Sequence, residues 1–129
     1  MSKITILLVD DSIDFLKILS VRVTSWGYDI IEAKDGSQAI KVMKEEKPNI
    51  IILDYLMPKM DGVATLKEIR KIDSMIPVIM FTAFPNNEVM KDVEKLGINA
   101  FIPKLSVYTD TLEALKSSIG IIAKNLKVE

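Results

Sequence analysis

The sequence predicts an α/β fold in which a parallel sheet is covered by helices on both faces. Two observations favour it: short apolar runs recur along the 129-residue chain, and the longer segments between them carry apolar residues at helical spacing. This alternation is typical of strands that are buried on both faces and joined by crossover helices. A third observation supports it, because most of the apolar runs end at a charged or hydroxyl residue. Ligands of open α/β sheets bind at such strand ends.

Five strands are expected, at residues 4–9, 28–33, 50–53, 78–81 and 100–103. The second is mixed in polarity, and the fifth contains Pro103, which has no backbone N–H to donate to a neighbouring strand. Both suit the edges of a sheet, whereas the other three are apolar enough for its centre. The predicted strand order is therefore 2-1-3-4-5, the flavodoxin-like doubly wound five-stranded parallel sheet, with five helices.

Helical periodicity occupies the segments between and after these strands. The first helix is expected over 12–26, with Asp11 or Ser12 as its N-terminal cap and Gly27 at its end. The fifth is expected from about 109 to 126, with Asp110 and Glu113 as a start that resembles a capping box. The other three are marked by Ala39, Ile40 and Met43 before Pro48, by Val63, Leu66 and Ile69, and by a segment from Asn86 or Asn87 to Gly97.

Composition limits the classes of function. Hydrophobic content of 49%, charged content of 27% and a net charge of -1 predict one globular domain over residues 1–129 and give no electrostatic reason to bind nucleic acid. The sequence shows no DNA-binding, catalytic or transmitter segment, so we expect no effector domain here, whether the chain stands alone or is a piece of a longer protein. No membrane span or signal peptide is visible, so we expect a cytoplasmic protein. The absence of cysteine and histidine excludes disulfides, thiolate or imidazole zinc sites and Ser-His-Asp catalysis. Any metal must be bound by oxygen atoms.

Three acids, a threonine and a lysine follow the expected strands and should meet at one edge of the sheet. Asp10 and Asp11 follow the first strand, Asp54 the third, Thr82 the fourth and Lys104 the fifth. The acidic pair alone could be only a helix cap that complements the helix dipole. Asp54 is harder to explain in this way, because it follows four branched apolar residues and a buried, unpaired charge is costly.

The charges of these residues predict a magnesium site. Carboxylates about 4 Å apart repel by roughly 4 kcal/mol per pair at an effective dielectric constant of about 20. Lys104 supplies one positive charge, and a hard divalent cation such as Mg²⁺ would relieve the rest. Thr82 and Lys104 also offer donors to a phosphoryl group, for which the carboxylate of Asp54 would be the nucleophile.

Along its whole length the chain resembles the receiver domain of response regulators, the phosphoacceptors of two-component phosphorelay signalling. The resemblance is carried by motifs in family order: Asp10-Asp11, the segment 54–62 from Asp54 to Asp61-Gly62, Thr82-Ala83, and the segment 96–101 that leads to Lys104. It implies that Asp54 accepts a phosphoryl group from a partner sensor histidine kinase or histidine phosphotransfer protein.

The resemblance also implies the roles of the surrounding residues. Asp11, Asp54 and the backbone carbonyl of Leu56 would bind Mg²⁺ directly, and Asp10 largely through water. Lys104, Thr82 and the amide of Ala83 would hold the phosphoryl oxygens. Thr82 and Phe101 would form the switch that changes a protein-binding face for an unidentified downstream protein target. The domain would be a monomer or weak dimer, and a signalling phosphoacceptor rather than an enzyme.

One departure from the family pattern and two alternative functions remain. Receiver domains usually place a proline after the lysine, often across a cis peptide, whereas Leu105 follows Lys104 here. We expect a trans bond, because a non-proline cis bond costs about 2.5 to 4 kcal/mol. One alternative is a receiver-like interaction module that is not phosphorylated. The other is a phosphatase with an aspartyl nucleophile, but Leu56 stands where such enzymes need a second acid.

Overall fold

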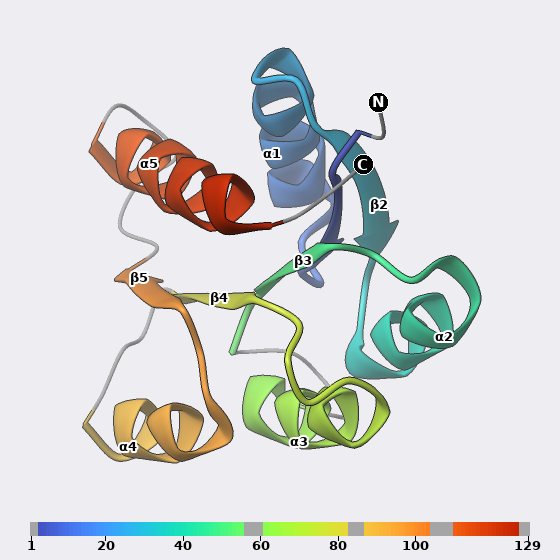
Figure 1. The fold of residues 1–129 in the computed structure, drawn as a ribbon, viewed down its shortest axis with the longest axis vertical. Coiled ribbons are helices and arrows are strands. Elements are labelled where there is room, and N and C mark those ends of the chain that lie inside the picture. The colour runs from blue at the N-terminus through green and yellow to red at the C-terminus, as the bar shows by residue number, and fades with distance from the viewer. Residues whose placement is uncertain (1–2, 56–60, 83–86, 104–109, 127–129) are drawn as a thin grey trace.

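A computed structural model describes residues 3–55, 61–82, 87–103 and 110–126 of the chain (Figure 1). Five parallel strands form one sheet in the order β2-β1-β3-β4-β5, as the sequence predicts. The edge positions of the second and fifth strands are also confirmed. The strands are β1 (Thr5–Val9), β2 (Asp29–Ala33), β3 (Ile50–Leu53), β4 (Val78–Thr82) and β5 (Ala100–Pro103).

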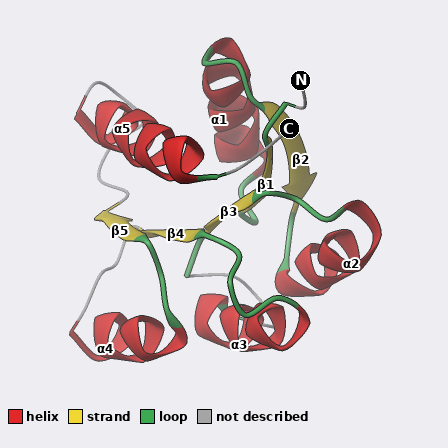
Figure 2. Cartoon of the chain, viewed as in Figure 1, coloured by secondary structure: helices red, strands yellow, loops and turns green. Residues whose placement is uncertain are grey.

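Helices cover both faces of the sheet (Figures 1 and 2). One face carries α1 and α5, and the other carries α2, α3 and α4. All five helices predicted from the sequence are present, which confirms the doubly wound arrangement. They are α1 (Ile13–Ser25), α2 (Gly36–Glu46), α3 (Gly62–Ile72), α4 (Asn87–Leu96) and α5 (Asp110–Asn125).

The core consists of two apolar clusters separated by the sheet. Successive residues of a strand point to opposite faces, so that Ile6 packs with α1 and α5 whereas Leu7 packs on the side of α2 and α3. All four residues of β3 are buried, which explains why this strand is apolar throughout. On the first face, Phe15 of α1 stacks on Phe81 of β4 with ring centroids 5.5 Å apart.

Helix ends follow the sequence signals in part. Ser12 is the cap of α1, and its hydroxyl accepts the backbone N–H of Phe15 at 3.2 Å. Gly27 and Gly97 follow α1 and α4 with φ of 99° and 82°, in the region that favours glycine. Lys47, which ends α2 in a left-handed conformation with φ of 48°, was not predicted. Asn86, residue 109 and the side chain of Asp110 lie outside the described part, so the predicted capping box stays a prediction.

Two asparagines close the amino-terminal edge of the sheet. The side-chain oxygen of Asn49 accepts the N–H of Thr5 at 2.8 Å, and the N–H of Asn49 returns a bond to the Thr5 carbonyl, also at 2.8 Å. Asn99 makes the same pair of bonds with Val78, at 3.1 and 2.8 Å. Asn49 precedes β3 and bonds both backbone groups of the first residue of β1. Asn99 precedes β5 and does the same for the first residue of β4. Both strand starts therefore keep paired backbone groups.

Candidate functional site

The backbone fixes three acids at the carboxyl-terminal edge of the sheet. Asp10 follows β1, and its N–H donates to the carbonyl of Ala33 at the end of β2 at 3.1 Å. Asp54 follows β3, and its N–H donates to the carbonyl of Val9 at 3.0 Å. Each bond continues the pairing of parallel strands by one residue. The acids therefore hold fixed positions at the point where the strand order reverses, which is where α/β sheets bind ligands.

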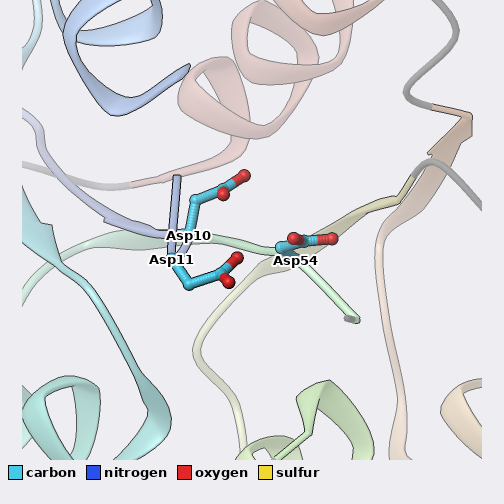
Figure 3. Close-up of side chains that lie close together, drawn as sticks. All are labelled: Asp10, Asp11 and Asp54. Carbon is cyan, nitrogen blue, oxygen red and sulfur yellow. The ribbon is translucent and has the colours of Figure 1, made fainter. Parts of the chain in front are cut away.

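The side chains of Asp10, Asp11 and Asp54 come together at this edge (Figure 3). One carboxylate oxygen of each lies within 4.8 Å of those of the other two. Asp10 is only 2% exposed and Asp54 5% exposed, whereas Asp11 is open to solvent. At such separations, two carboxylates repel by about 3 kcal/mol at an effective dielectric constant of about 20. The gathering of acids predicted from the sequence is confirmed.

Local hydrogen bonding orients Asp10. One of its carboxylate oxygens accepts the backbone N–H of Ser12 at 2.9 Å, two residues later in the chain. Ser12 in turn caps α1, so the first turn of the helix and the acid are held together. The alternative that the acidic pair is only a helix cap is therefore not supported, since Ser12 caps α1 and Asp10 and Asp11 face Asp54.

The donor set fits a hard divalent cation. Mg²⁺ binds oxygen ligands at about 2.0 to 2.1 Å, so that its ligands lie about 3 to 4 Å from one another. Separations up to 4.8 Å between the three carboxylates are within a small side-chain rotation of that arrangement. A cation would also neutralise the carboxylates of Asp10 and Asp54, because their burial limits solvation by water. The three acids therefore suit Mg²⁺ by chemistry and by spacing.

Gly62 also lies at this edge, and its close contact with the backbone of Asp54 and Tyr55, directly after β3, was not predicted from the sequence. Its N–H donates to the carbonyl of Tyr55 at 2.8 Å. A Cβ atom on Gly62 would lie 2.6 Å from the Cα of Tyr55 and 2.7 Å from the carbonyl oxygen of Asp54. Only glycine fits here. The sequence signal was present, because Asp61 and Gly62 form the start of a helix a few residues after Asp54.

The remaining predicted site residues are described only in part. Thr82 is the last residue of β4 and pairs with Pro103 of β5, but its side chain is not described. Phe101 pairs with Met80 and is partly buried against the apolar cluster beneath α2, α3 and α4. Its role as a switch stays a prediction. Leu56, Ala83, Lys104 and the Lys104–Leu105 peptide lie outside the described residues.

Comparison with known proteins identifies the family. A family model described as the response regulator receiver domain matches residues 6–116. The chain belongs to this family. Receiver domains act as signalling phosphoacceptors of two-component response regulators, contact histidine kinases and downstream effectors, and usually bind Mg²⁺ at an acidic cluster of this kind. The resemblance inferred from the sequence is thus confirmed.

Individual relatives agree with this assignment. The chain is 39% identical over 104 residues to a probable transcriptional regulator ycf27 of Porphyridium aerugineum, covering 81% of the chain and 43% of the relative. It is 37% identical over 101 residues to the transcriptional regulatory protein ZraR of Escherichia coli, covering 78% and 23%. The chain therefore spans less than half the length of these regulators.

A solved structure shows the same fold. The CheX-CheY-BeF₃-Mg²⁺ complex of Borrelia burgdorferi contains a chain that is 34% identical to this one, with a TM-score of 0.81. The match covers 92% of this chain and 88% of that chain.

In the present structure, none of the helices among the described residues is long and apolar enough to span a membrane.

Proposed function

We propose that this receiver accepts a phosphoryl group on Asp54 from a phosphohistidine of a sensor histidine kinase or a histidine phosphotransfer protein. The observation that carries the proposal is the position of Asp54, which is 5% exposed at the end of β3, with two further acids within 4.8 Å. One oxygen of its carboxylate attacks phosphorus, the bond from phosphorus to the histidine nitrogen breaks, and the imidazole keeps the electron pair. The product is an acyl phosphate.

Mg²⁺ would be bound by Asp11, Asp54 and the backbone carbonyl of Leu56, and by Asp10 through water. When bound, it supplies positive charge that screens the acids and the incoming phosphoryl oxygens. Asp10 is suited to an outer role, because one of its oxygens is already engaged by the N–H of Ser12. Lys104, Thr82 and the amide of Ala83 would donate to the phosphoryl oxygens.

The output is a change in a protein-binding face. A phosphoryl group brings about -1.5 to -2 charges and three strong acceptors, which would draw the hydroxyl of Thr82 toward Asp54. Phe101 would follow, because it lies on β5 beside β4 and is only partly buried. The domain then acts through a downstream protein, as a phosphoacceptor that catalyses only its own phosphorylation and dephosphorylation.

Incubation with Mg²⁺ and acetyl phosphate, followed by intact-mass measurement, tests this proposal. We expect a single phosphoryl adduct in the natural chain and none in Asp54→Ala. Asp92→Ala is the matched control, because Asp92 is an exposed acid of α4 outside the cluster. It should be modified like the natural chain.

Other outcomes would redirect the interpretation. Absence of an adduct together with absence of Mg²⁺ binding would favour the interaction module that is not phosphorylated. An adduct that persists in Asp54→Ala would place the phosphoacceptor elsewhere. Removal of Mg²⁺ with a chelator should abolish the reaction in the natural chain.

A further inference from the structure

Arg70, in the last turn of α3, joins three separate segments of the chain. Its guanidinium donates to the carbonyls of Leu96 and Gly97, at 2.9 and 2.5 Å, where α4 ends. It also donates to the carbonyls of Asp73 and Ile76, at 3.3 and 2.8 Å, in the loop that leads from α3 to β4. Four carbonyl groups thus share one side chain.

The carbonyls of Leu96, the last residue of α4, and of Gly97, which follows it, have a particular need for such a donor. The last carbonyls of a helix have no partner within the helix, and a cation near this end also complements the helix dipole. Gly97 turns the chain away with φ of 82°. Arg70 therefore provides a C-terminal cap for α4 that comes from a different helix. Sequence analysis did not find it, because an arginine on an amphipathic helix also suits a solvated face.

The site requires an arginine rather than any cation. Arg22 and Arg70 are the only arginines among the 17 lysine and arginine residues of the sequence. A planar guanidinium presents donors in several fixed directions, whereas a lysine ammonium is a compact point charge. Burial lowers the pKa of Arg70, an effect that the nearby Asp73 carboxylate partly offsets. Asp73 also accepts the N–H groups of Met75 and Ile76 and so keeps the loop folded around the guanidinium.

The opposite end of α3 lies against the backbone of Asp54 and Tyr55, directly after β3. Gly62, the first residue of α3, leaves no room for a Cβ atom beside the carbonyl oxygen of Asp54. A single helix therefore contacts the backbone of Asp54 at one end and holds the end of α4 through Arg70 at the other. Buried apolar residues such as Leu66 and Ile69 keep the helix against the sheet between these two contacts.

We propose that Arg70 is a positioning residue that fastens the C-terminal end of α4 to α3. Ligand binding at the acidic site then changes the position of α4 through α3. The fastening depends only on the contacts of Arg70, and the coupling to the site rests on the proposed function. Phe101 packs against the same apolar cluster as Val93 and Leu96 of α4. The position of α4 therefore bears on the surface that the domain offers to partners.

Hydrogen exchange of the full chain, without and with Mg²⁺ and beryllofluoride, tests the proposal. In the free protein, Arg70→Lys should speed amide exchange at residues 93–97 by about tenfold, because the fixed set of donors to the α4 carbonyls is lost. Amides of β1 and β3 should keep their rates. Arg22→Lys is the matched control, because Arg22 is an exposed residue of α1. Unchanged exchange at residues 93–97 in Arg70→Lys would overturn the fastening.

The ligand arm tests the coupling. In the natural chain and in Arg22→Lys, Mg²⁺ with beryllofluoride should alter exchange in both α3 and residues 93–97. In Arg70→Lys, the change in the first turn of α3 should remain and the change at residues 93–97 should be lost. An equal change in exchange at residues 93–97 in the natural chain and in Arg70→Lys would overturn the coupling. No change there in the natural chain, despite ligand binding, would also overturn it.

Two measurements keep these readings separate. If urea unfolding shows that Arg70→Lys lowers global stability enough to affect every amide, exchange at residues 93–97 is compared with exchange in β1 and β3 of the same variant, because only a local loss changes their ratio. A natural chain that binds no beryllofluoride would contradict the proposed function and the coupling, while the free-protein exchange would still decide the fastening.

Discussion

The two edges of the sheet differ in the polar side chains that they carry. At the amino-terminal edge, Asn49 and Asn99 are neutral and form reciprocal hydrogen bonds with the neighbouring strand starts. At the carboxyl-terminal edge, Asp10, Asp11 and Asp54 bring like charges within 4.8 Å. One edge satisfies its polar groups, and the other concentrates charge. The difference indicates that stability is built at the first edge and partly given up at the second, where a ligand can restore it.

The largest expected effect tests how tightly the functional edge is packed. Gly62→Ala should lower the free energy of unfolding by about 2 to 3 kcal/mol, because its Cβ would clash with backbone atoms that cannot move aside. Gly120→Ala is the matched control, because Gly120 lies within α5 and a Cβ there meets nothing within 4 Å. It should raise stability by about 0.5 to 1 kcal/mol. Urea unfolding measures both, and equal effects would contradict the close contact.

The next effect concerns the amino-terminal edge. Asn99→Ala should lower the free energy of unfolding by about 1 to 2 kcal/mol, because the N–H of Val78 loses its acceptor. Mg²⁺ affinity, measured by calorimetry, should not change. Asn125→Ala, at the exposed end of α5, should change neither quantity. Weaker Mg²⁺ binding in Asn99→Ala would show that the two edges are not independent.

A smaller effect of opposite sign is expected at the acidic edge. Without divalent cations and at low salt, Asp54→Asn should raise the free energy of unfolding by about 1 kcal/mol, because one of three mutually repelling charges is removed. Adding Mg²⁺ should stabilise the natural chain more than the variant. Thermal unfolding with and without Mg²⁺ measures both. A destabilised Asp54→Asn would mean that repulsion is already balanced in the free protein.

The smallest effect is expected at the end of α2, shortly before β3 begins at the amino-terminal edge of the sheet. Lys47→Gly should raise the free energy of unfolding by about 0.5 kcal/mol, because Lys47 adopts φ of 48° and glycine does so at lower cost. The same change at Lys44, inside α2, should lower stability by about 1 kcal/mol. Denaturation midpoints of the two variants should therefore move in opposite directions.

Sequence reasoning found the features that depend on local pattern. The apolar runs gave the strands, the mixed run around Glu32 and the proline at position 103 gave the sheet edges, and Ser12 and Gly27 marked the ends of α1. The acids at strand ends followed from topology alone, because parallel strands end at one edge. These inferences needed only neighbours in the sequence and one rule about sheets.

The features that escaped prediction join residues far apart in the chain. Asn49 bonds to a residue 44 positions away, and Arg70 to residues 26 and 27 positions away. Nothing in the neighbouring sequence distinguishes either from a solvated side chain. Lys47 escaped for a different reason, because its left-handed conformation contradicts the usual preference of a lysine. Tertiary contacts decided the first two features.

The sequence positions of the three acids have a consequence for how the site arises. Asp10, Asp11 and Asp54 all belong to the first 54 residues, and β1 lies beside β3 in the sheet, so the acids are synthesised before β4 and β5. The later strands then add Thr82 and Phe101. The order of synthesis thus separates the three acids, which suit Mg²⁺, from Thr82 and Phe101, the predicted switch.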